Sequence, residues 1–139
     1  MRGLAVIGFC CVGMALAGDL PRTAAPEGAA VYILRPADGE VVTSPVRVVF
    51  GLQKMGVAPA GINAKGTGHH HLLIDTPLPD LDKPIPADAK HLHFGGGQTE
   101  AVIELEPGEH TLQLLLGDAN HIPHQPPVMS NPITIVVTP

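Results

Sequence analysis

The chain is poor in the residues that build several common kinds of binding site. Its 139 residues contain no tryptophan, one tyrosine and two cysteines, and aromatic residues make up 3% of the composition. Sites for sugars and peptides usually depend on aromatic side chains, so this composition argues against both ligand classes. Eight Lys and Arg residues are outnumbered by 13 Asp and Glu residues, which gives a formal net charge of -5. Such a chain lacks the basic face that binds nucleic acid or an anionic membrane surface.

Both cysteines lie in residues 1–17, which have the pattern of a secretory signal. The basic residue Arg2 precedes an apolar run of 14 residues, which is shorter than the ~20 residues that span a membrane. The run ends in Ala-Leu-Ala at 15–17, the small-x-small pattern of signal-peptidase sites. We therefore expect residues 1–17 to be cleaved, which leaves a periplasmic or secreted protein that begins at Gly18. The alternative is a lipoprotein signal with lipid on Cys11.

Cleavage at this point changes the chemistry available to the mature protein. The remaining 122 residues contain no cysteine and carry a formal net charge of -6, because the segment removed contains one basic and no acidic residue. Neither a disulfide nor a thiolate ligand is then possible, and stability depends on an apolar core, for which this length suffices. No second long apolar run follows, so we expect no membrane insertion after cleavage. A net acidic protein attracts cations.

The mature chain predicts strands and turns, with no convincing amphipathic helix. Residues 18–29 are dominated by Pro, Ala and Gly and are expected to form a flexible leader. Short β-rich runs then recur with turn signals between them, such as Pro107-Gly108. We predict an all-β domain over residues 30–139, an immunoglobulin-like β-sandwich of about seven strands with long Pro- and Gly-rich loops.

Eight histidines are the most unusual feature of the chain. Seven of them fall in three clusters, GHHHLLID at 68–75, KHLHFGGG at 90–97 and GDANHIPH at 117–124. Alternate residues of a strand share a face, so His69 and His71 are expected on one face of the first cluster. His70 is then expected on the opposite face, together with Leu72 and Ile74, where it points into the core and forms a hydrogen bond.

We predict that the three clusters together form a metal site. Two imidazoles about 7 Å apart along a strand can converge on one ion, since metal–nitrogen bonds are about 2.0–2.1 Å and the rings add reach. The predicted ligands are His69, His71, His91, His93, His121 and His124. The eighth histidine, His110, is expected to be structural, because it lies at a corner where immunoglobulin-like domains often carry a tyrosine.

The residue types limit the identity of the metal. Without cysteine, Cys-rich zinc, iron–sulfur and blue-copper sites are excluded. A site of several imidazoles suits Cu(II), Zn(II) or Ni(II), and we expect copper first and zinc second. The expected role is binding, delivery or protection of the ion, with an envelope protein as a possible partner.

Two other functions fit the same residues. In one, the protein is a structural or interaction module of the envelope, whose histidines form a hydrogen-bond network without metal. In the other, it is a zinc-dependent enzyme, because H-x-H pairs on strands also occur in zinc lyases. Such an enzyme needs an open metal position with a general acid or base beside it. The glycines at 95–97 precede no Gly-Lys-Ser/Thr and no helix, so they favour a bulge or a close backbone approach over a phosphate loop.

The strings GHHHLLID, HLHFGGGQTE and LGDANHIPHQPPVMS together resemble a family of small exported bacterial proteins known only as a domain of unknown function. The resemblance extends from about Val31 to Val137. It implies an exported protein with one such domain behind a signal peptide, and it implies no substrate or catalytic residue.

Overall fold

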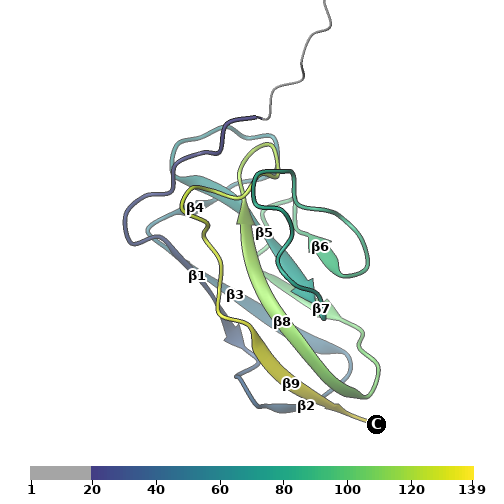
Figure 1. Cartoon of the computed structure of the whole chain (residues 1–139). Coiled ribbons are helices and arrows are strands. Elements are labelled where there is room, and N and C mark those ends of the chain that lie inside the picture. The colour runs from purple at the N-terminus through teal and green to yellow at the C-terminus, as the bar shows by residue number, and fades with distance from the viewer. Residues whose placement is uncertain (1–19) are drawn as a thin grey trace, which may run out of the picture.

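The computed structural model describes residues 20–139 and confirms an all-β fold (Figure 1). Nine strands lie within these residues. They are β1 Ala30–Arg35, β2 Val41–Thr43, β3 Val46–Gln53, β4 Gly56–Val57, β5 Thr67–Ile74, β6 His91–His93, β7 Glu100–Ile103, β8 Gly108–Gly117 and β9 Ile133–Thr138. In this part of the chain no helix is long and apolar enough to cross a membrane. The expected signal segment, residues 1–17, lies outside the described residues, so its cleavage stays a prediction.

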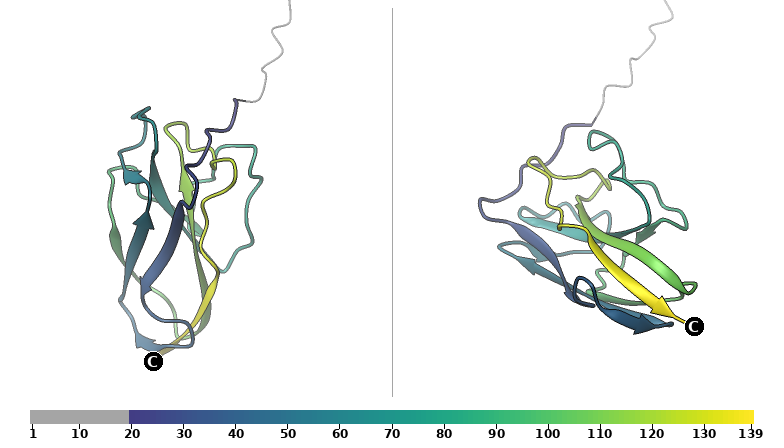
Figure 2. Two further views of the ribbon diagram at one scale, coloured as in Figure 1. Left: turned by 90° about the vertical axis from the view of Figure 1, so that its left-hand side faces the viewer. Right: turned by 60° about the horizontal axis from the view of Figure 1, so that its bottom comes forward.

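The strands form two sheets that pack face to face (Figure 2). The smaller sheet has the order β1-β3-β7, and the larger has the order β2-β9-β8-β5-β4 with β6 paired to β5. The grouping of β1, β3 and β7 against β5, β8 and β9 is that of an immunoglobulin-like sandwich. The predicted fold class is therefore confirmed, and the short strands β2 and β4 add to the number expected.

The core between the sheets is aliphatic and follows the period-two pattern of the strands. In β3, Val46, Val48 and Phe50 are buried while Arg47 is exposed. The buried residues of this core are Val31, Val46, Val48, Phe50, Leu72, Ile74, Ile103, Leu112, Leu114, Leu116, Val128, Ile135 and Val137. Because residues 20–139 contain no cysteine, burial of these side chains is the main stabilising term, at about 1.5–3 kcal/mol for each large one.

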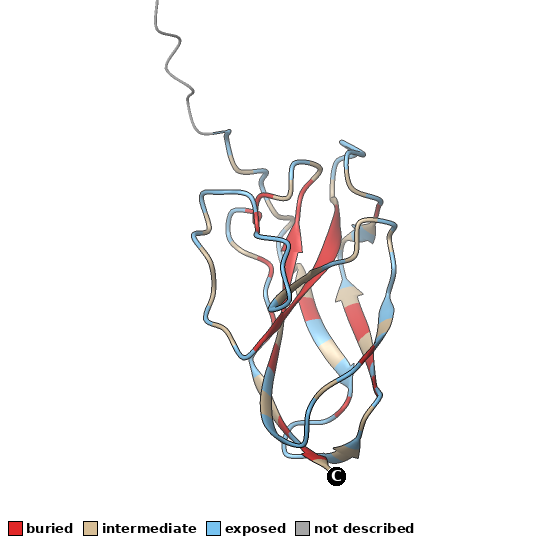
Figure 3. Ribbon diagram, turned by 90° about the vertical axis from the view of Figure 1, so that its right-hand side faces the viewer, coloured by how far each residue is buried: buried red, intermediate tan, exposed pale blue. Residues whose placement is uncertain are grey.

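Strand β5 is buried on both faces, unlike most of the other strands (Figure 3). Its inner face contributes to the core between the sheets. Its outer face is covered by loop 75–90, where Ile85 packs with Leu73 and Leu115 in a second apolar cluster. This cover explains why side chains that point away from the main core are nevertheless removed from solvent.

The segment expected to be a flexible leader, residues 18–29, is attached to the domain over residues 22–25. Ala24 forms a parallel β-bridge with Gln125. The bridge rests on backbone hydrogen bonds, which a composition rich in Pro, Ala and Gly does not reveal. Residues 22–25 are therefore attached to the β-sandwich, whose first strand begins at Ala30.

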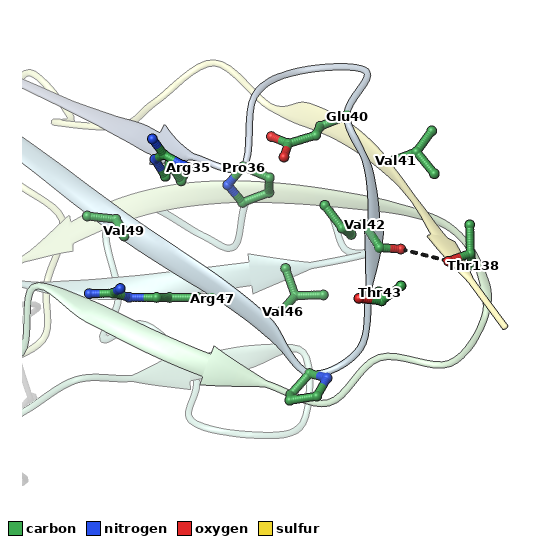
Figure 4. A pocket seen from close by; sticks show the side chains of 11 residues that line it. Arg35, Pro36, Glu40, Val41, Val42, Thr43, Val46, Arg47, Val49 and Thr138 are labelled. Atoms are coloured by element: carbon green, nitrogen blue, oxygen red, sulfur yellow. Dashed lines mark hydrogen bonds between the residues drawn. The ribbon is translucent and has the colours of Figure 1, made fainter.

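A cleft of about 610 Å³ opens at the end of the sandwich near the C-terminus (Figure 4). It is lined by Arg35, Pro36, Glu40, Val41, Val42, Thr43, Pro45, Val46, Arg47, Val49 and Thr138. No histidine lines this cleft, so it is separate from the three histidine clusters, which gather toward the other end of the molecule.

Candidate metal centre

Four imidazole rings meet on the outer side of β5. His69 and His71 belong to β5, His93 belongs to β6, and His121 lies in the loop after β8. The ring centroid of His69 lies 4.8 Å from that of His71 and 5.0 Å from those of the other two rings. The remaining centroid distances are 5.1 Å for His71–His93, 4.8 Å for His93–His121 and 6.1 Å for His71–His121. These four residues, the histidine cluster, therefore surround one point in space.

Strand pairing positions three members of the cluster. The antiparallel register of β5 and β6 places His71 opposite His93, and the two-residue repeat of β5 places His69 on the same face. One nitrogen from each of these three rings can be chosen so that all lie within 4.8 Å of one another. Nitrogens bound to one ion at about 2.0–2.1 Å in a tetrahedron lie about 3.3 Å apart. Small rotations of the rings therefore suffice to complete a three-nitrogen site.

A tight turn carries the fourth ring into the cluster. His121 has a backbone φ of 66°, a conformation that is uncommon for residues other than glycine. The turn is held by Asp118, whose Oδ1 accepts hydrogen bonds from the N–H groups of Asn120 at 2.8 Å and Ile122 at 3.0 Å. The N–H of His121 donates to the Asp118 carbonyl at 2.9 Å. Asp118 is thus a positioning residue that the histidine spacing alone did not identify.

Two glycines leave the space that the imidazoles occupy. A Cβ at Gly95 would lie 2.3 Å from Cε1 of His93, and a Cβ at Gly117 would lie 2.8 Å from Cε1 of His71. Both distances are shorter than real carbon contacts, so any side chain at either position would displace a ring. The close approach expected at the glycine run 95–97 is therefore made to a specific partner, the ring of His93. Gly117 was not singled out in the sequence, although it directly precedes the Asp-x-x-His loop.

Burial keeps the strand-borne imidazoles neutral. Removal from water, followed by repulsion from neighbouring histidines, lowers the pKa of His69 to about 4 and that of His71 to about 3. Burial, followed by the charge of His121, also lowers the pKa of His93. Neutral imidazole is the form that binds a metal ion, so these rings are in the ligand form at pH 7.

The cluster contains buried polar atoms with no partner among residues 20–139. Both ring nitrogens of His69 and both of His71 make no hydrogen bond, and both side chains are fully buried. A buried polar group left unpaired costs about 1–3 kcal/mol. A histidine network that only braced loops would use these nitrogens for hydrogen bonds. A metal ion bound by one nitrogen of each ring fits them better, and the donor set suits an ion that prefers imidazole.

Two of the six predicted ligands lie outside the cluster. Nδ1 of His91 is 2.9 Å from the Asp88 carboxylate, and Nε2 of His124 is 3.2 Å from the Thr67 carbonyl. His91 is two residues from His93, but the turn before β6 holds its ring on Asp88. The structure therefore brings together four of the predicted ligands and gives each of the other two a hydrogen-bond partner outside the cluster.

His70 faces the main core, as the alternation of β5 predicts. Its ring packs on that of Phe50 with a centroid distance of 5.0 Å, and burial lowers its pKa to about 4. The expected hydrogen bond is not found, because neither ring nitrogen has a partner within the described residues. His70 is therefore neutral and contributes to the core by packing.

His110 lies near the start of β8 and connects two turns. Its Nδ1 is 2.7 Å from the Asp75 carboxylate, and its Nε2 is 2.8 Å from the Glu106 carbonyl. Both partners are acceptors, so both contacts are hydrogen bonds only when the ring is protonated and each nitrogen donates. The bond to Asp75, and then that to Glu106, raises the pKa of His110 above its usual value.

This arrangement predicts a stabilising effect of His110 that depends on pH. Because its folded-state pKa lies above the unfolded value of 6.5, its contribution is complete below pH 6.5 and is lost as pH rises through the folded-state pKa. The loss of unfolding free energy caused by His110→Ala should be about 1 kcal/mol larger at pH 6 than at pH 9. Urea unfolding of both proteins with a chelator present measures this difference. Equal losses at both pH values would show that folding does not raise the pKa of His110.

Comparison with known proteins supports the family resemblance and adds no named relative. A family model described as Domain of unknown function (DUF4399) matches residues 48–138. This range contains the whole histidine cluster and confirms the resemblance carried by the three histidine motifs. No curated protein and no solved structure gives a significant match.

Proposed function

We propose a metal-binding function for this chain, which belongs to the family described as Domain of unknown function (DUF4399). In this proposal His69, His71 and His93 bind one transition-metal ion, and His121 supplies a fourth nitrogen. The observation that carries the proposal is the convergence of four imidazoles, two of which, His69 and His71, are fully buried with ring nitrogens that have no partner among the described residues. Cu(II) is the first candidate and Zn(II) the second, because every donor is an imidazole.

The surroundings of the cluster favour binding of an ion and not catalysis on a substrate. Neither of the two cavities described for this chain is lined by a histidine. The nearby residue Asp118 is 4% exposed, and both of its carboxylate oxygens accept hydrogen bonds. Asp118 is thus poorly placed to act as a general base, but its charge partly offsets that of a divalent ion bound to neutral ligands. We infer a role in binding, delivery or protection of the ion, in the periplasm or outside the cell.

Metal titration tests this proposal directly. The mature protein without a histidine tag, titrated with Cu(II) and separately with Zn(II) at pH 7.5, should bind one ion per chain with a dissociation constant below about 1 μM. Dissociation constants above about 10 μM for both ions would contradict the proposal. The histidines would then be interpreted as packing and hydrogen-bonding residues of an envelope module.

The glycine beneath His93 gives a second test that leaves every ligand in place. In Gly95→Ala the new methyl group displaces the His93 ring, and affinity for the ion should fall about tenfold or more. Gly96→Ala is the matched control, because a Cβ there meets only the flexible side chain of Gln98. The two variants should differ in a competition assay with a chromogenic chelator. Equal affinities would exclude His93 from the site.

A further inference from the structure

The N-terminal segment 22–25, here called the strap, is bonded to the loop that follows β8. The N–H of Ala25 donates to the carbonyl of Gln125 at 2.9 Å, and the N–H of Gln125 donates to the carbonyl of Thr23 at 2.9 Å. Figure 1 shows the start of the described chain passing over the end of the sandwich where this loop lies. The strap precedes residues 48–138, which the family model matches, so the family match gives no account of it.

Two side chains of the strap reach into the same loop. The hydroxyl of Thr23 donates to Oδ2 of Asp118 at 2.6 Å. The guanidinium of Arg22 donates to the carbonyl of Pro123 at 3.0 Å and also to the carbonyl of His124. The Arg22 side chain is 17% exposed, so these hydrogen bonds are largely shielded from water. The strap therefore contacts this loop from Asp118 to Gln125.

Asp118 links the strap to the metal centre. One oxygen of its carboxylate accepts the Thr23 hydroxyl, and the other fixes the turn on which His121 stands. A change in the strap is therefore transmitted to the His121 ring through a single buried carboxylate.

His121 is the movable ligand of the proposed four. His69 and His71 lie on β5, which is paired with β8, and His93 lies on β6, which is paired with β5. His121, by contrast, belongs to no strand and lies in a turn held by Asp118, which the strap contacts. Exchange of the ion would therefore begin with the departure of His121, because moving the other ligands would break the sheet.

We propose that the strap is a latch that holds His121 on the metal ion and so controls how fast the ion is exchanged. The inference rests on the proposed function and assigns Arg22 and Thr23 as positioning residues. When the strap is released, the bond from the metal to His121 breaks and an incoming ligand, such as an imidazole, a thiolate or a chelator, takes the open position. No oxidation state changes in this exchange.

Release kinetics of the loaded mature protein test the latch. Thr23→Val removes the hydroxyl donor with little change of shape, and Arg22→Gln removes the guanidinium. Each should speed transfer of Zn(II) to excess chelator about tenfold, while the loaded protein still holds one ion per chain. Thr43→Val and Arg47→Gln make the same changes on β2 and β3, far from the loop, and should release the ion at the wild-type rate.

A variant that lacks His121 separates the latch from a general loosening of the fold. His121→Ala alone should release the ion faster, and adding Thr23→Val to it should cause no further change, since the latch acts through His121. Additive acceleration in the double variant would overturn the inference, as would wild-type release rates for both strap variants. Failure of the wild type to bind metal would refute the proposed function, whereas binding with no strap effect would refute only the latch.

Discussion

Replacing His93 by alanine should lower the affinity for Cu(II) or Zn(II) by more than about 100-fold, whereas replacing His91 should change it less than about threefold. The residues are two positions apart on β6, but only His93 belongs to the histidine cluster, while His91 contacts Asp88. Loss of groups that merely orient a ligand already costs about 10–100-fold in metal affinity, so loss of a ligand should cost more. Competition titration of both variants measures the difference.

This pair of variants is well matched. His91 and His93 lie on the same short strand, outside the buried core, and neither substitution leaves a large cavity. A general effect of losing an imidazole would therefore appear in both. If His91→Ala weakens binding as much as His93→Ala, the ion is not held where the cluster places it.

Replacing His71 by leucine should stabilise the metal-free protein by about 1–3 kcal/mol and abolish its stabilisation by metal. The gain follows because His71 is fully buried and neither ring nitrogen has a partner within the described residues, an arrangement whose cost leucine removes. The loss follows because a metal bound only to the native state adds about 2.7 kcal/mol at 100 times its dissociation constant. Urea unfolding at pH 7.5, with chelator and with excess Zn(II), gives both quantities.

His70→Leu is the control for these two effects of His71→Leu. His70 is also buried without a hydrogen bond in the described structure, but it faces Phe50 in the main core. The substitution should stabilise the metal-free protein similarly and leave the response to Zn(II) intact. The account would be contradicted if the two leucine variants responded alike to the metal, or if His71→Leu weakened the metal-free fold.

The sequence predicts the sandwich because apolar and polar residues alternate along its strands as buried and exposed positions do. The alternation in β3 assigns its inner face. The same rule places His70 on one side of β5 and both His69 and His71 on the other side, as the structure confirms. In a regular strand the position of a residue determines the face on which its side chain lies, so both assignments follow from a period of two residues.

The sequence predicts the direction of a side chain poorly where a loop or a strand end determines that direction. His91 and His93 repeat the H-x-H spacing of β5, yet β6 is three residues long and begins beside the turn at Asp88. His91 therefore forms a hydrogen bond with that turn. The strap depends on hydrogen bonds between segments about 100 residues apart, and no local pattern encodes these contacts.

Anomalous diffraction from crystals of the Zn(II)-loaded mature protein tests the central claim most directly. Data collected on both sides of the zinc absorption edge should show one strong site per chain. The account predicts this site at about 2.0–2.1 Å from a nitrogen of each of His69, His71 and His93, with His121 as the fourth ligand. Absence of a site in crystals grown with excess zinc, or a site bound instead by His91 or His124, would contradict it.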